Sequence, residues 1–249
     1  IRVNGKELVD SDVTPSNVPS IASQVLANPT AGFSIIKAST DSTNTLRTVG
    51  HSLGKEPELI ISKNLEWSDA WFTYHKDIQT NNKQYLNVNS YTGVASSGAT
   101  LWGHTSSVMG FNGALWVPGG ATDEIIFYCF TSVEGYSKVS SYTGTASKNF
   151  IYTGFAPAWV MIKRYSDDTV AQWTVWDTAR SPSNLNQQKL WLDATASEED
   201  HPNNSIDIVS NGFVLDPPGN SNRQYTNDSG KGYIYLAFAS HPFKTARAR

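Results

Sequence analysis

The chain has 249 residues, a formal net charge of −3 and a single cysteine. The absence of a basic stripe argues against a nucleic-acid partner, and one cysteine, Cys129, excludes an internal disulfide. No apolar run approaches the roughly 20 residues of a membrane-spanning helix, so we expect no membrane insertion.

The N-terminal stretch holds the one segment with helical character. The sequence "NVPSIASQVLANP" offers Asn17 as a cap and Pro19 in a first turn, and it places three apolar residues on one side: Ile21, Val25 and Leu26. We therefore predict a short helix over residues 19–27, within a connector of residues 1–31. If these three residues met on a three-fold axis, they would support a trimeric assembly.

Two short segments, 100 positions apart, resemble each other. "EPELIISKN" begins at Glu56 and "APAWVMIKRY" begins at Ala156, and each has a proline, an apolar run and then a lysine. Proline suits the first residue of a strand, and a short apolar run bounded by turn residues and charge predicts a strand buried on both faces.

The order of these similarities continues along the chain. "WFTY" is answered by "WTVW", "QYLNVN" by "LWLDA", "SVMGFNGALWV" loosely by "DIVSNGFVLD", and "EIIFYCF" by "GYIYLAF". We interpret this as two copies of one unit, the first over residues 32–136 and the second over residues 137–249. Because Gly, Ser, Thr and Asn separate β-rich runs, we predict an all-β fold of two tandem, similar β-sandwich (jelly-roll-like) units.

The sequence contains no recognisable catalytic or cofactor-binding motif. The five histidines form no zinc pattern, and there is no nucleophile elbow, P-loop or dinucleotide fingerprint, so we expect a non-enzymatic protein without cofactor or metal. The acidic cluster "SEEDH" at 197–201 lacks calcium-loop spacing and is interpreted as a solvated loop, and Asp167 with Asp168 as a hairpin turn. Cys129 lies in the apolar run "IIFYCF" and is expected to be a buried small hydrophobe.

The positions that the two copies share are glycines, prolines, aromatics, aliphatics and one lysine, which are core and turn residues. What differs are loops rich in Ser, Asn, Gly and Tyr, and such loops on a rigid scaffold suit a binding surface. Three loop aromatics are candidates for stacking on sugar rings, with local packing as the alternative for each: Tyr91, Trp102 and Tyr225.

A series of segments carries a family resemblance: "NPTAGFSIIKAST", "VGHSLGKEPELIISKN", "VEGYSKVSSYTGTA", "FIYTGFAPAWVMIKR", "WTVWDTAR" and "GYIYLAFASHPFKTARAR". Over residues 28–249 the chain resembles a tandem β-domain of bacteriophage tail-fibre and related virion proteins, of marine and cyanobacterial phage type. The resemblance implies a virion structural protein in the distal part of a tail fibre, made in the host cytoplasm and mounted on the virion surface. Its implied partners are other virion proteins, further copies of itself in a homotrimer, and a host-surface glycan or receptor.

Two other functions stay open at this point. A head fibre or capsid decoration protein would use the same loops to contact neighbouring virion proteins. A depolymerase acting on host glycan would need two carboxylates about 5–10 Å apart in a groove.

Overall fold

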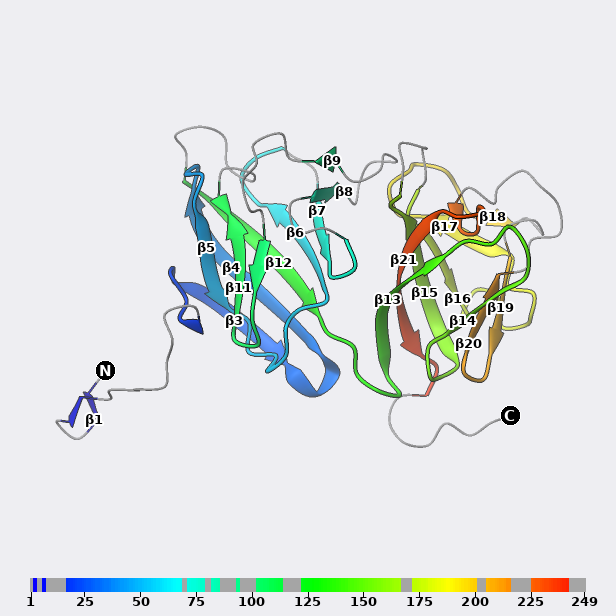
Figure 1. Cartoon of the computed structure of the whole chain (residues 1–249), viewed down its shortest axis with the longest axis horizontal. Helices are drawn as coiled ribbons and strands as arrows, with labels where there is room; N and C mark the ends of the chain where they lie inside the picture. Colours follow the sequence, from blue (N-terminus) through cyan, green and yellow to red (C-terminus); the bar gives the residue numbers. More distant parts are fainter. Residues whose placement is uncertain are drawn as a thin grey trace.

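The computed structural model describes residues 2–3, 6–7, 17–68, 71–78, 82–85, 93–94, 102–113, 122–166, 172–200, 205–215 and 225–241. The chain is all-β, as predicted, and forms two sandwiches that lie side by side along the long axis of the molecule (Figure 1). The short hairpin of β1 (Arg2–Val3) and β2 (Lys6–Glu7) lies at the N-terminal end. Within the described part of the chain, no helix has the length and apolarity that crossing a membrane requires.

The first sandwich consists of a seven-stranded and a three-stranded antiparallel sheet. The large sheet runs in the order β3 (Ser23–Asn28), β4 (Phe33–Asp41), β12 (Thr122–Phe130), β6 (Leu59–Asn64), β7 (Phe72–His75), β8 (Asn82–Tyr85) and β9 (Gly93–Val94). The small sheet runs in the order β10 (Trp102–His104), β11 (Val108–Asn112) and β5 (Leu46–Gly50).

The second sandwich begins with the strand at Ser137. Its large sheet runs in the order β13 (Ser137–Thr143), β21 (Gly232–Ala239), β15 (Pro157–Arg164), β16 (Thr174–Asp177), β17 (Gln188–Trp191) and β18 (Glu199–Asp200). Its small sheet runs in the order β14 (Asn149–Tyr152), β20 (Gly212–Leu215) and β19 (Ile206–Val209).

The two sandwiches share one topology. If β3 is set aside, each strand of the first half has a counterpart at the same place in the same order, from β4 and β13 to β12 and β21. In this comparison β11 corresponds to β20, because each is the middle strand of its small sheet. The alignment of "SVMGFNGALWV" with "DIVSNGFVLD" is therefore shifted by a few residues from the one made on sequence alone. β3 is the one strand of the first sandwich without a counterpart among the described residues of the second.

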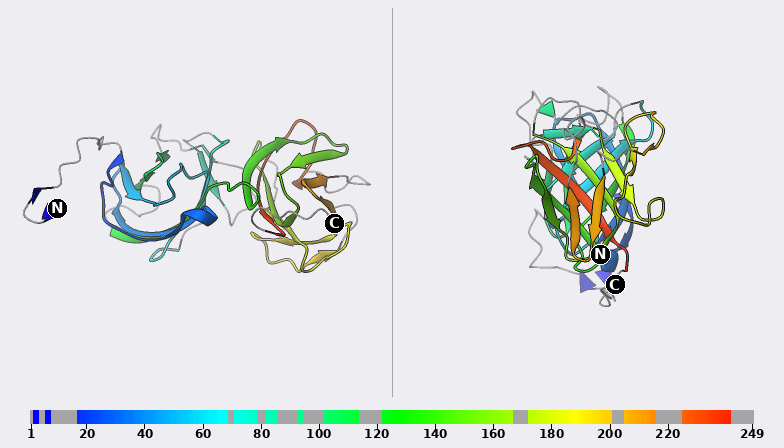
Figure 2. Two further views of the ribbon diagram at one scale, coloured as in Figure 1. Left: turned by 90° about the horizontal axis from the view of Figure 1, so that it is seen from below. Right: turned by 90° about the vertical axis from the view of Figure 1, so that its right-hand side faces the viewer.

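Each sandwich has its own core between the large and small sheets, and a third core joins the two. The first core includes Phe72 and Phe127, and the second includes Trp176 and Phe213. The third core lies between the outer faces of the large sheets, with Leu59 from β6 against Met161 and Trp173 of the second half. The two sandwiches lie next to each other (Figure 2), and the third core packs apolar side chains from both of them together.

β15 shows why the repeated segment has its composition. The strand begins at Pro157, and alternate residues of the following run face opposite sides. Val160 and Ile162 enter the second core, while Met161 enters the third. The prediction of a strand buried on both faces is confirmed.

The predicted N-terminal helix is wrong. Residues 23–28 form β3, which pairs antiparallel with β4, so that Val25 lies opposite Ile36. Pairing with the edge of β4 overrides the helical pattern, and Asn28 and Pro29 form the turn of a hairpin rather than a helix end. Of the three apolar residues, Ile21 packs on the first core, whereas Val25 is 40% exposed and Leu26 is 73% exposed.

Candidate recognition surface

The connection after β6 presents two exposed apolar side chains on a firmly held loop. Asn64, the last residue of β6, is 1% exposed, and its Oδ1 accepts hydrogen bonds from the backbone N–H groups of Glu66 and Trp67, at 2.8 Å each. Its Nδ2 donates to Asp123 Oδ2 at 2.7 Å. A side-chain oxygen that accepts hydrogen bonds from the backbone two and three residues ahead fixes a turn, so Asn64 fixes the backbone of this loop.

Strand β12 also holds this loop through hydrogen bonds. The N–H of Leu65 donates to the carbonyl of Glu124 at 2.9 Å, and Glu66 Oε1 accepts from the N–H of Glu124 at 3.1 Å. Because β12 supplies these contacts, the loop is tied to the central region of the large sheet. We call residues Leu65–Trp67 the Trp67 loop.

The Trp67 loop exposes two large apolar side chains, which folded proteins usually bury. Leu65 is 48% exposed and Trp67 is 57% exposed, although burial of an indole contributes several kcal/mol, as an order of magnitude. An aromatic ring presented on a loop with a fixed backbone can stack on an apolar ligand face. The sequence analysis missed this residue.

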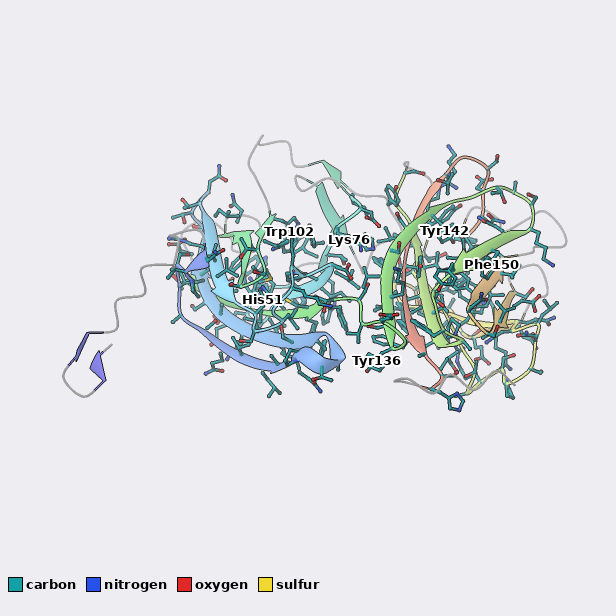
Figure 3. All side chains as sticks on the ribbon, turned by 60° about the horizontal axis from the view of Figure 1, so that its bottom comes forward. His51, Lys76, Trp102, Tyr136, Tyr142 and Phe150 are labelled. Carbon is teal, nitrogen blue, oxygen red and sulfur yellow. The ribbon has the colours of Figure 1, made fainter. Side chains whose placement is uncertain are left out.

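Of the three predicted stacking aromatics, Trp102 is a wrong prediction. It lies on β10 with its side chain directed inward, is 2% exposed, and packs with its ring centroid 5.6 Å from that of Tyr74 (Figure 3). A buried indole cannot stack on an external ligand. The flanking glycine and serines suggested a loop, whereas pairing of β10 with β11 makes this stretch part of the small sheet.

Tyr225 is half-buried and engaged in local packing, and Tyr91 lies outside the described residues. The ring of Tyr225 meets that of Trp191 edge-on, with centroids 4.6 Å apart. The amine of Lys189, which is 1% exposed, lies 4.0 Å from the Trp191 centroid and 2.9 Å from Glu199 Oε2. Burial lowers the pKa of Lys189, while Glu199 counters the shift. These contacts make Tyr225 part of a closed structural cluster.

The acidic stretch that begins at Ser197 also serves internal ion pairs. Glu199 pairs with Lys189, and Glu198 pairs with Arg180 at 2.7 Å. Among the described residues, no three His, Cys, Asp or Glu side chains gather as a metal site would require. The turn predicted at Asp167 and Asp168 lies outside the described residues, although the strands it would join, β15 and β16, are paired antiparallel.

The lysine that the two repeats share has two different environments. Lys63 is half-buried, and its amine donates to the carbonyl of Trp67 at 3.5 Å. Its counterpart Lys163 is buried, 3.7 Å from Asp193 Oδ2, and desolvation lowers its pKa to about 8. Desolvation also raises the pKa of Asp193 to about 6, so both groups are charged at neutral pH and form a buried ion pair.

Among the described residues, the side chains of His75 and Cys129 are buried and that of His104 is half-buried. Burial lowers the pKa of His75 and of His104 to about 3, and it raises the pKa of the Cys129 thiol. His104 packs edge-on against Tyr74, with ring centroids 4.3 Å apart. Cys129 is 0% exposed and lies in the first core, as predicted. These three groups are largely shielded from solvent, whereas the Trp67 loop is exposed.

A protein-family model described as "Domain of unknown function (DUF7483)" matches residues 10–242. No curated protein and no solved structure matches the chain.

Proposed function

The chain belongs to the DUF7483 family, and we propose that this member is a non-enzymatic virion structural protein of a bacteriophage, in the distal part of a tail fibre, that binds a host-surface glycan. The phage assignment is supported by the resemblance of residues 28–249 to tail-fibre domains. Binding is supported by a scaffold with three apolar cores that carries an exposed, fixed aromatic loop.

The observation that carries the proposal is the combination of exposure and order at the Trp67 loop. A Trp on a flexible loop would lose conformational entropy on binding, whereas Asn64 already fixes the backbone of Glu66 and Trp67 in the free protein. Trp67 is therefore preorganised to stack on the apolar face of a sugar ring. Single sites of this kind bind weakly, with Kd near the mM range, and gain strength when several copies bind together.

A homotrimer would supply that multivalency, and we propose it as the assembly. Three copies on one fibre tip would present three Trp67 loops. A linked set of weak sites gains about 10²–10⁴ in avidity when the geometry permits simultaneous binding.

Binding to host cells and to a glycan array tests the proposal directly. We expect the full chain to bind, Trp67→Ala to weaken binding by at least about tenfold, and Leu192→Ala to bind as wild type, since Leu192 is similarly exposed, at 49%, but lies in the second sandwich. Equal binding by wild type and Trp67→Ala would refute the role of the loop. Release of new reducing ends from host glycan would favour a depolymerase instead.

A further inference from the structure

The outer edge of the small sheet in the second sandwich exposes two aromatic side chains. β14 is the edge strand of the order β14-β20-β19, with Phe150 48% exposed and Tyr152 62% exposed. Figure 3 labels Phe150 in this half of the molecule. Two large exposed rings at alternate positions of one strand form an apolar patch that folding alone does not require.

The matched edge in the first sandwich is covered by the chain itself. Ser20 lies against β5: its N–H donates to the carbonyl of Thr48 at 2.9 Å, and its Oγ accepts from the N–H of Thr48 at 2.8 Å. Thr48 Oγ1 donates to the carbonyl of Val18 at 3.2 Å. A Cβ atom built on Gly50 would lie 3.7 Å from Cγ of Pro19. The segment Val18–Ile21 therefore covers the edge of β5 at Thr48, through hydrogen bonds that all involve this one residue.

The register shows that Phe150 occupies the position of Thr48. Val49 faces Met109 in the first small sheet, and Ile151 faces Phe213 in the second, all four within their cores. Thr48 thus corresponds to Phe150, and Gly50 corresponds to Tyr152.

The backbone groups of Phe150 point to the open side. In an antiparallel ladder, alternate residues bond to the neighbouring strand and the residues between them bond outward. The N–H of Thr153 donates inward to the carbonyl of Asn211 at 3.0 Å, so Phe150 and Tyr152 are the outward-bonding residues. The Tyr152 carbonyl accepts from Tyr235 Oη at 3.2 Å, whereas no described residue takes the place of Ser20 at Phe150.

In the described part of the second sandwich, no segment preceding its first strand covers this edge, because the connection into that strand is short. Residues 131–136 alone connect β12 to β13, and they form a tight turn in which the N–H of Val133 bonds to the carbonyl of Ser137 at 3.1 Å. In the first sandwich, by contrast, residues 18–28 precede β4 and close this side. Among the described residues, the edge at Thr48 is therefore covered, whereas the matching edge at Phe150 is open.

We propose that the edge of β14 is the docking site for an extended polypeptide segment of a partner protein. The segment lies in extended form next to Phe150 and bonds its backbone, as Val18–Ile21 covers the backbone of Thr48, with a small hydroxyl side chain accepting from the Phe150 N–H. The backbone bonds supply affinity, and the Phe150 and Tyr152 rings supply apolar contacts, with Tyr152 placed where Pro19 contacts Gly50 in the first half. This site is separate from the Trp67 loop and does not rest on glycan binding.

A labelled synthetic peptide with the sequence of residues 17–26, NVPSIASQVL, tests this with the full chain. We expect saturable binding and at least about tenfold slower amide hydrogen exchange in residues 149–152, but not in 46–50. A peptide with Ser20→Ala should bind about tenfold more weakly, because it loses the hydroxyl that accepts from the edge N–H.

Two substitutions of one residue separate a strand from other occupants. Phe150→Ser removes the ring and keeps the N–H, whereas Phe150→Pro removes both and leaves the bonds between β14 and β20 intact, since this N–H points outward. Strand addition predicts that Phe150→Pro binds the peptide much more weakly than Phe150→Ser, and that Leu192→Ser binds it as wild type does.

Several results would overturn the proposal. Equal loss in Phe150→Ser and Phe150→Pro would mean that the ring alone matters, as for a glycan. Protection confined to residues 46–50 would mean that the peptide only exchanges with the chain's own segment. Self-association of the chain through β14 that the peptide cannot compete with would assign the edge to a second copy. If Phe150→Pro lowers the thermal transition, the Ser20→Ala peptide decides: unchanged affinity for it contradicts strand addition.

Discussion

Substitution of Leu59 by alanine tests whether the third core makes the two sandwiches one cooperative unit. Leu59 is 1% exposed and packs, from the first half, in the cluster that contains Met161 and Trp173 of the second half. Leu→Ala at a buried site costs about 2–5 kcal/mol, and for a chain of this size each kcal/mol lowers the Tm by about 2–4 °C. A mid-range cost of about 3 kcal/mol therefore predicts a Tm lower by about 6–12 °C.

Calorimetry combined with hydrogen exchange provides the assay. We expect wild type to unfold in one transition, and Leu59→Ala to weaken amide protection in β13 and β21 of the second half as much as in β4 and β12 of the first. Leu192→Ala, at an exposed position, should change stability by no more than about 0.5 kcal/mol. Two separate transitions in wild type, or a loss of protection confined to the first half, would refute the reasoning.

Three further perturbations follow from buried and capping polar groups. Asn64→Ala removes the acceptor of the Trp67 loop and should cost about 1–2 kcal/mol while speeding exchange of the Trp67 amide; unchanged exchange would contradict the preorganised loop. The folded-state pKa of His104, about 3, lies below its ordinary value of 6.5, so the unfolded chain binds the proton first and stability falls as pH drops below about 6.5. At pH 5, protonation linked to His104 lowers the free energy of unfolding by up to about 2 kcal/mol relative to neutral pH. Denaturant titrations at several pH values should find a smaller pH dependence in His104→Phe. The same pH dependence in wild type and variant would contradict this role of His104. Lys163→Met leaves the buried Asp193 unpaired and should cost about 3–5 kcal/mol, much of which Asp193→Asn should restore in the double variant; no recovery would argue against an ion pair.

The repeated strand at Pro157 was predictable because its consecutive apolar residues require burial of both faces. A proline and an alanine followed by four large apolar residues predict a strand with two covered faces, and β15 has this structure. The same logic holds for the apolar segments "EIIFYCF" of β12 and "GYIYLAF" of β21, which pair with the equivalent strands β6 and β15.

The predictions that failed depend on which partner covers a segment, which a local pattern does not state. Residues 23–28 have spacing that suits a helix, but the open edge of β4 recruits them as a strand. Trp102 is surrounded by loop-like residues, yet its place on β10 directs the ring inward.

Two exposed features were present in the sequence but needed the structure for their meaning. Trp67 follows an asparagine at a strand end, a pattern that predicts a turn, but the burial of Asn64 and the exposure of the indole come only from the folded sheets. Among the described residues the edge of β14 is open because the connection at 131–136 is short, and this is seen only when the two sandwiches are compared strand by strand.

Locating the chain in an intact phage particle by electron cryo-microscopy tests the proposed function most directly. We predict density for three copies at the distal end of a tail fibre, with the Trp67 loops facing outward. Density on the capsid, or a Trp67 loop packed against a neighbouring virion protein, would contradict host recognition by this surface.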